Sequence, residues 1–198
     1  DEAKSIQQTS DGGYIVAGGT WSNDGDMSGN HGGSDAWVVK LNSSGDIIWQ
    51  KCFGGTDDDV ATSIQQTSDG GFIVAGYTSS NDGDVSGNHG GSDAWVVKLN
   101  SSGDIIWQKC FGGTDNDEAK SIQQTSDGGY IVAGETWSND GDVSGNHGNS
   151  DYWVVKLNSS GDIEWQKCLG GTVKDIAKTI QQTSDGGFIV AGYTNSND

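Results

Sequence analysis

The sequence has no proline and no arginine, and lysine supplies all ten of its basic side chains. With 28 Asp and Glu residues the formal net charge is −18, and only 32% of the residues are hydrophobic. Nucleic acids and anionic membranes require a basic face, so the charge argues against both as partners and suits a cation better. No apolar run approaches the ~20 residues that a membrane-spanning helix needs, so we expect no membrane span.

The chain also lacks a signal peptide and begins with Asp1 instead of methionine. These features predict a mature fragment or an excised piece of a longer protein. A strongly acidic surface without arginine suits a soluble secreted protein, so we expect an extracellular or cell-surface location.

Cysteine is scarce, and the three that occur occupy one equivalent position in three repeats: Cys52, Cys110 and Cys168. An odd number of cysteines at equivalent sites is not a disulfide framework. Free cysteine is among the most buried residue types, so we expect buried thiols. A reactive or intermolecular role is the alternative.

The abundant feature is an internal repeat. The stretch "SIQQTSDGGYIVAG" begins at Ser5, and near-copies begin at Ser63, Ser121 and Thr179, a constant step of 58 residues. The first two units differ at only seven positions: Tyr14/Phe72, Gly19/Tyr77, Trp21/Ser79, Met27/Val85, Asp58/Asn116, Val60/Glu118 and Thr62/Lys120. A period of this size predicts a solenoid, a propeller or an array.

The content of one unit favours the propeller. Turn residues separate four β-branched or aromatic segments, and no segment has a helical period. For the second unit we expect strands near 62–68, 71–78, 93–99 and 104–110. "AWVVKL" and "IIWQKCF" carry apolar side chains on both strand faces, which suits a blade covered by a neighbour on each side. The predicted fold is an all-β β-propeller built from 58-residue four-stranded blades.

The chain would hold three blades and half of a fourth within one repeat domain, residues 1–198. We place blade 1 at about 1–54, blade 2 at about 55–112, blade 3 at about 113–170 and the half blade at 171–198. Because propellers usually have four to eight blades, the chain is either part of a longer array or self-associates to complete a ring. Both chain ends carry the first hairpin of a unit, so simple head-to-tail joining would not complete the half blade.

The run "GGTDDDVATSIQQTSDGGFIVAGYTSS…GGSDAWVVKLNSSGDIIWQKCFGG" resembles the SBBP-type β-propeller repeat family. The "LNSSGDIIW" segment is also similar to PQQ-type propeller repeats, in which a glycine is followed four residues later by a docking tryptophan. Gly45 and Trp49, Gly103 and Trp107, and Gly161 and Trp165 fit that spacing. The resemblance covers nearly the whole chain and implies a propeller fold, but such propellers host many functions.

An acidic, glycine-rich loop recurs at 22–37, 80–95 and 138–153 and fits the spacing D-x-D-x-S-G-x5-D. Calcium takes six to eight oxygen ligands, and loops of this spacing supply them from the first, third, fifth, seventh and twelfth positions. We therefore predict calcium sites at Asp24, Asp26, Ser28, Asn30 and Asp35, at Asp82, Asp84, Ser86, Asn88 and Asp93, and at Asp140, Asp142, Ser144, Asn146 and Asp151.

Two features leave an alternative open. The twelfth position is Asp instead of the usual bidentate Glu, and the flanking segments are strands instead of helices. The same composition also makes plain solvated turns. A second acidic turn, "TDDD" at 56–59 with its counterparts at 114–117 and 172–175, lacks a repeated ligand spacing, and we expect a solvated connection there.

The histidines, cysteines and carboxylates of the sequence do not indicate an active site. His31, His89 and His147 lie in the acidic loops, where we expect solvent-exposed side chains. A Cys–His dyad is unfavourable because the cysteine lies within a strand and the histidine in a loop. Paired carboxylates could serve a glycosidase, but active sites usually break repeat symmetry, and these units are nearly the same. We expect no catalytic residues.

Tryptophan falls into two groups. Trp37, Trp95, Trp153, Trp49, Trp107 and Trp165 lie at repeated strand positions, where we expect packing within and between blades. Trp21 and Trp137 lie beside the acidic loops and are replaced in other units. An exposed tryptophan can stack on a sugar ring or anchor a protein, so these two are candidate ligand-binding residues.

The function that these patterns favour is a non-enzymatic, extracellular or cell-surface propeller-repeat module for adhesion, display or structural assembly, stabilised by calcium. Its partner would be a protein or glycan on a surface. The alternative is a lectin-like propeller that binds glycans, and the third hypothesis is a calcium-dependent hydrolase or lyase.

Overall fold

A computed structural model describes residues 1–197, so the last residue of the predicted half blade, Asp198, lies outside the described part. The described residues form fourteen strands and no helix. It follows that they contain no helix able to cross a membrane. The strands are β1 (Glu2–Gln8), β2 (Tyr14–Thr20), β3 (Asp35–Leu41), β4 (Ile47–Phe53), β5 (Asp59–Gln66), β6 (Phe72–Thr78), β7 (Asp93–Leu99), β8 (Ile105–Phe111), β9 (Asp117–Gln124), β10 (Tyr130–Thr136), β11 (Asp151–Leu157), β12 (Ile163–Leu169), β13 (Asp175–Gln182) and β14 (Phe188–Thr194).

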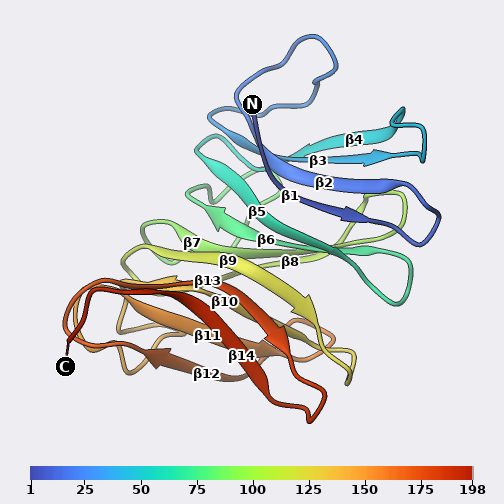
Figure 1. Cartoon of the computed structure of the whole chain (residues 1–198). Helices are drawn as coiled ribbons and strands as arrows, with labels where there is room; N and C mark the ends of the chain where they lie inside the picture. The colour runs from blue at the N-terminus through green and yellow to red at the C-terminus, as the bar shows by residue number, and fades with distance from the viewer. Residues whose placement is uncertain (198) are drawn as a thin grey trace.

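The strands form three four-stranded antiparallel sheets and one hairpin, each in chain order: β1-β2-β3-β4, β5-β6-β7-β8, β9-β10-β11-β12 and β13-β14. Figure 1 shows the sheets following one another from the N-terminal to the C-terminal end. The predicted all-β class and the four strands per unit are confirmed. Closure of the sheets around a common axis stays a prediction.

Local sequence explains the hairpins. In the turn between β5 and β6, the carboxylate of Asp69 accepts hydrogen bonds from Thr67 Oγ1 at 2.5 Å and from Gly71 N at 2.9 Å. Gly70, between them, has a φ of 82°, which side chains disfavour. The turn between β7 and β8 repeats the device with Asn100, whose Oδ1 accepts from the N–H groups of Ser102 and Asp104. Asx turns of this kind fix the register of both hairpins.

Alternating side chains give each complete sheet two apolar faces, and in the second and third sheets neighbouring units cover both. Val74 and Trp95 of the second sheet pack in one cluster with Ile15 and Val38 of the first. The opposite face of the same sheet packs in a second cluster with the third sheet, through residues that include Ile73. The middle sheets are therefore stabilised by burial on both sides, as the apolar pattern predicts.

A tryptophan at each junction connects one unit to the next. Trp49 of β4 meets Phe72 of β6 edge to face, with ring centroids 5.9 Å apart, and Trp107 meets Tyr130 in the same way. A methyl group on Gly103 would lie 3.0 Å from the Trp49 ring. The glycine on which Trp49 docks therefore belongs to the turn of the following unit, not to the turn four residues before it.

The first strands of successive units also join at their edges. Ser5 Oγ accepts a hydrogen bond from Ile64 N at 3.3 Å, and Gln7 Oε1 accepts one from Gln66 N at 2.6 Å. In return Gln66 Oε1 accepts one from Ser10 N at 2.8 Å. The same three hydrogen bonds recur at the other two junctions. They satisfy backbone groups that an open strand edge would leave exposed.

We predict that Gly103→Ala destabilises the chain more than Gly45→Ala. Both glycines have positive φ, 78° and 89°, so alanine costs each about 1–2 kcal/mol of backbone strain. Only Gly103 faces a neighbouring tryptophan, and nothing lies within 4 Å of a methyl group on Gly45. Overpacking against Trp49 should add about 1–3 kcal/mol to the free energy lost.

Urea unfolding followed by tryptophan fluorescence measures the difference. Equal losses for the two variants would show that Trp49 does not hold the junction.

Candidate functional site at the unit junctions

The three acidic loops connect the second and third strands of each complete sheet. In the first loop, Gly25 and Gly29 have φ values of 64° and 92°, which permit two sharp reversals. Asn23 Oδ1 accepts a hydrogen bond from Gly29 N at 3.1 Å, and Asp24 O accepts one from Met27 N at 3.0 Å. The repeated Asn, Asp and Gly residues therefore shape the loop through its own backbone.

The end of each loop is fixed by a buried aspartate. Asp35 Oδ2 accepts hydrogen bonds from His31 N at 3.0 Å and from His31 Nδ1 at 2.6 Å. The Asn30 amide group donates to the carbonyl oxygens of Thr20 and Gly33. His89 with Asp93 and His147 with Asp151 repeat the pair. The His side chain is 42% exposed in the first loop, yet it is bonded to a fully buried carboxylate.

The sequence pattern placed Asp, Ser and Asn side chains around one ion, but the structure directs them to different neighbours. Asp82 accepts hydrogen bonds from Thr56 N and Oγ1, in the connection between β4 and β5, at 2.9 and 3.0 Å. Ser86 Oγ accepts one from Gln108 Nε2 at 2.7 Å. Asp140 and Ser144 repeat these contacts with Thr114 and Gln166.

The remaining candidate ligands vary in exposure. Asp24 and Asp26 are exposed, Asp84 and Asp142 are half-buried, and Asp35, Asp93 and Asp151 are buried. Asn88 and Asn146 hold backbone carbonyls through their amides, as Asn30 does. Ser28 accepts from Gln50.

As they lie, many of these fifteen side chains are engaged by other hydrogen-bond partners. Within residues 1–197, no three Asp, Glu, His or Cys side chains are grouped so that they could hold a metal ion. One observation points the other way, because the second carboxylate oxygen of Asp35, of Asp93 and of Asp151 is buried without a hydrogen-bond partner. Calcium binding stays a prediction of the sequence pattern.

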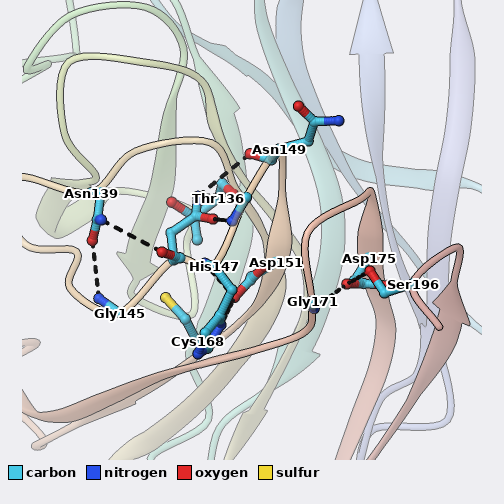
Figure 2. Close-up of polar contacts among 12 residues, drawn as sticks. Thr136, Asn139, Gly145, His147, Asn149, Asp151, Cys168, Gly171, Asp175 and Ser196 are labelled. Carbon is cyan, nitrogen blue, oxygen red and sulfur yellow. Dashed lines mark hydrogen bonds and ion pairs between the residues drawn. The ribbon is translucent and has the colours of Figure 1, made fainter. Parts of the chain in front are cut away.

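A pocket opens at each junction between complete sheets. The first, of about 420 Å³, is lined by His31, Cys52 and the Lys51–Asp104 ion pair, and Asp84 reaches it from the next unit's loop. The second, of about 430 Å³, has the equivalent lining with His89 and Cys110. The loop folds back over strand β4, so the cysteine and the histidine of one unit line the same pocket. Figure 2 shows Cys168 beside His147 and Asp151 in the third unit.

The thiols in these places are not activated. Burial is the main cause that raises the pKa of Cys52 to about 11, and the charge of Asp35 adds to it. Burial likewise raises the pKa of Cys110 and of Cys168 to about 12. All three residues are buried free thiols, as expected. At neutral pH they are protonated, so they are poor nucleophiles.

A second buried carboxylate lies at each junction, where the sequence pattern predicts a solvated turn. The expectation of a solvated connection at 56–59 is wrong for Asp59, which is fully buried. Its equivalent in the next unit, Asp117, is fully buried as well. Asp117 accepts hydrogen bonds from Thr136 Oγ1, from Ser138 Oγ at 2.8 Å and from Gly113 N at 2.8 Å. Figure 2 shows the third copy, where Gly171 and Ser196 bond Asp175. The sequence did contain one indication of this burial. Of the aspartates in "TDDD", "TDND" and "TVKD", only the last is present in all three.

The two candidate ligand-binding tryptophans are exposed, Trp21 by 60% and Trp137 by 40%. Trp137 lines a pocket of about 340 Å³ with Asn116, Asn149 and Asp115 among its polar groups. Lys174 Nζ lies 5.2 Å from the centroid of the Trp137 ring. An aromatic side chain beside amide and carboxylate groups is a combination that sugars use in binding.

Comparison with known proteins adds little to this geometry. No protein-family model matches the chain. The chain is 26% identical over 163 residues to regulatory protein FlaEY of Caulobacter vibrioides, a match that covers 77% of this chain and 17% of FlaEY. The crystal structure of Sqt1 from Chaetomium thermophilum is similar with a TM-score of 0.45 and 13% identity, over 94% of this chain and 39% of Sqt1. The chain thus spans well under half of either protein, and the resemblance to SBBP-type repeats stays a prediction.

We predict opposite effects for two isosteric substitutions of buried aspartates. Asp117→Asn replaces an acceptor that three donors surround and should cost about 1–3 kcal/mol of unfolding free energy. Asp93→Asn removes a charge with one unpartnered oxygen and should leave stability at pH 7 unchanged or higher. Burial raises the pKa of Asp93, and the Asp117 charge raises it further against the His89 hydrogen bonds.

The pH dependence checks the cause. Because the pKa of Asp93 is higher in the folded chain than in the unfolded chain, its contribution to stability is fully present below ~3.9 and is lost as pH rises through the folded value. Any gain from Asp93→Asn should therefore disappear toward pH 4 in thermal melts. A gain that persists at low pH would show that charge is not its source.

We expect EDTA to leave the melting temperature unchanged, because the loops are held by hydrogen bonds and the Asp82 carboxylate is engaged by Thr56. Calorimetry in EDTA and in calcium measures this. A fall in melting temperature that calcium reverses, and that Asp82→Asn abolishes, would instead establish the calcium site that the sequence predicts.

Proposed function

We propose that this chain is a non-enzymatic, extracellular or cell-surface propeller-repeat module for adhesion, display or structural assembly. The observation that carries the proposal is repetition: both junctions between complete sheets present the same pocket with equivalent residues. A surface that recurs unchanged from unit to unit suits a ligand or partner that also repeats.

The propeller arrangement has its own support. Each following unit places its first strand against the preceding sheet, where β5 contacts β1, β2 and β3, and β9 contacts β5, β6 and β7. The first strands β1, β5, β9 and β13 are thus neighbours along one side of the stack. Neighbouring inner strands and sheets covered on both faces are what blades around an axis require.

The chemistry of the junction pockets favours binding over catalysis. Their cysteine thiols are protonated at neutral pH, since burial raises the pKa values of Cys52 and Cys110 to about 11 and 12. The Nδ1 atoms of His31 and His89 are engaged by buried aspartates. The exposed groups that remain, among them a Lys–Asp ion pair, can orient a polar ligand.

Location outside the cell is part of the proposal and rests on the acidic charge of −18. Acidic surfaces keep proteins soluble and suit cationic partners, including basic protein patches. The word "regulatory" in the name of FlaEY describes that much longer protein, and the proposal does not depend on it.

A lectin-like module is the second candidate, and the Trp137 pocket favours it. That pocket occurs where the third unit differs from the second, which has Ser79 in place of the tryptophan. Trp21 occupies the equivalent position of the first unit and is more exposed.

A glycan array, run with and without calcium, separates the two candidates. For an adhesion or assembly module we expect no specific glycan binding. Glycan signals that disappear in Trp137→Ala but persist in Trp21→Ala would overturn this proposal and establish the lectin function. Each substitution removes an exposed side chain, so both variants should melt as the parent does.

A further inference from the structure

Within residues 1–197, two sheet faces have no neighbour, and they are opposite faces of the repeat. On the N-terminal sheet, Ile6 is 66% exposed, whereas the equivalent Ile64 is 5% exposed. On the C-terminal hairpin, Ile189 is 60% exposed, whereas the equivalent Ile73 is fully buried. We call the first surface, β1 with Ile6, the N-face, and the second, the side of β13–β14 with Ile189, the C-face.

The small differences between units alternate along the chain. "DEAKSIQQ" occurs at 1–8 and again at 117–124, and "FIVAGYT" occurs at 72–78 and again at 188–194. The first and third units thus share their first strand, and the second unit and the C-terminal hairpin share their second strand, whereas Lys178 of the hairpin matches Lys4 and Lys120 instead of Thr62. The alternating residues concentrate on strands that meet at the junctions.

The junction between the second and third sheets shows how the two types fit. There the strand "FIVAGYT" receives the strand "DEAKSIQQ", and Lys120 Nζ lies 6.0 Å from the centroid of the Tyr77 ring. Glu118 forms an ion pair with Lys120. Burial raises the pKa of Tyr77, and the charge of Glu118 contributes to the rise, so the tyrosine and this strand share one environment.

The two free faces carry these same two strand sequences. The C-face ends in "FIVAGYT" with Tyr193 exposed, and the N-face begins with "DEAKSIQQ" with Glu2 and Lys4 exposed. We propose that the C-face of one copy docks on the N-face of a second copy in the manner of the junction between the second and third sheets. One residue differs: Lys178, whose Nζ lies 5.5 Å from the centroid of the Tyr193 ring, stands in the place of Thr62. The proposal deepens the assembly role proposed above and rests on it.

The groups for the edge hydrogen bonds of that junction are also present at the free faces. Ser63 Oγ accepts from Ile122 N, Gln65 Oε1 accepts from Gln124 N, and Gln124 Oε1 accepts from Ser68 N. Equivalent groups at the free faces are Thr179, Gln181 and Ser184 on the C-face and Ile6 and Gln8 on the N-face. The docked pair can therefore form all three hydrogen bonds.

The docked interface would be smaller than an internal junction. An internal first strand contacts three strands of the preceding sheet, as β9 contacts β5, β6 and β7, and the C-terminal hairpin offers only two. It also lacks the fourth strand whose tryptophan packs on the next unit. Head-to-tail docking leaves the outer edge of β14 open, in agreement with the expectation that it does not complete the half unit. Association should therefore depend on concentration.

The experiment is sedimentation velocity of the whole chain over a concentration series, with two variants that each block one face. Ile6→Asp places a charge on the N-face, and Ile189→Asp places one on the C-face. Both side chains are mostly exposed in a single copy, so the fold of each variant should persist, which circular dichroism and melting confirm. Ile106→Asp is the matched control, since Ile106 is 56% exposed although its sheet has neighbours on both sides.

We expect the parent and the control to associate, and each blocked variant alone to weaken association by roughly tenfold or more. An equal mixture of the two blocked variants should form dimers and nothing larger, because one intact N-face meets one intact C-face. Monomers at every concentration, or a blocked variant that still dimerises alone as the parent does, would overturn the docking proposal. Folded monomers would rule out this docking but not the adhesion and display roles. The glycan array is the separate experiment that distinguishes those roles from a lectin function.

Discussion

Every complete sheet has apolar side chains on both faces, and the rest of the structure follows from the need to cover them. One four-stranded sheet cannot hide both sides of strands such as β7, in which every residue is buried. A neighbouring unit is therefore part of each unit's own core. The tryptophan of β4 or β8 and the glycine turn that receives it set the spacing, and the glutamines of the inner strands join the edges.

The polar half of the chain is organised by the same stacking. Asp59 and Asp117 are buried at the junctions. They accept hydrogen bonds from backbone N–H groups of the turn before them, at Gly55 and Gly113, and from hydroxyl groups after the second strand, at Ser80 and Ser138. The His–Asp pairs fix the ends of the long loops over strands that carry the cysteines. Many of the aspartates that suggest a metal site therefore also accept hydrogen bonds that hold the loops in place.

The sequence was informative where a residue's role is local or repeated. Turn glycines, β-branched segments and the 58-residue step predicted the strands, and the second unit's strands begin within three residues of their expected positions. It failed where contacts cross between units. The partner of Trp49 is Gly103 of the next unit, and this pairing cannot be read from spacing inside one unit. The partner of Asp82 is Thr56 in the connection before β5, which the ligand spacing inside the acidic loop does not indicate. The burial of Asp59 depends on Ser80 and the loop that follows β6. An aspartate in an acidic turn is otherwise expected to be solvated.

The alternation of unit types has a consequence for how such a stack can end. Each junction joins a face of one type to a face of the other. A closed ring that keeps this rule must therefore contain an even number of units. An odd total would put a tyrosine strand such as β6 against a first strand such as β5, which has Thr62 at the position from which Lys120 approaches Tyr77. A few substitutions can thus restrict the number of units in a closed assembly, whereas fully uniform repeats would accept an even or an odd number.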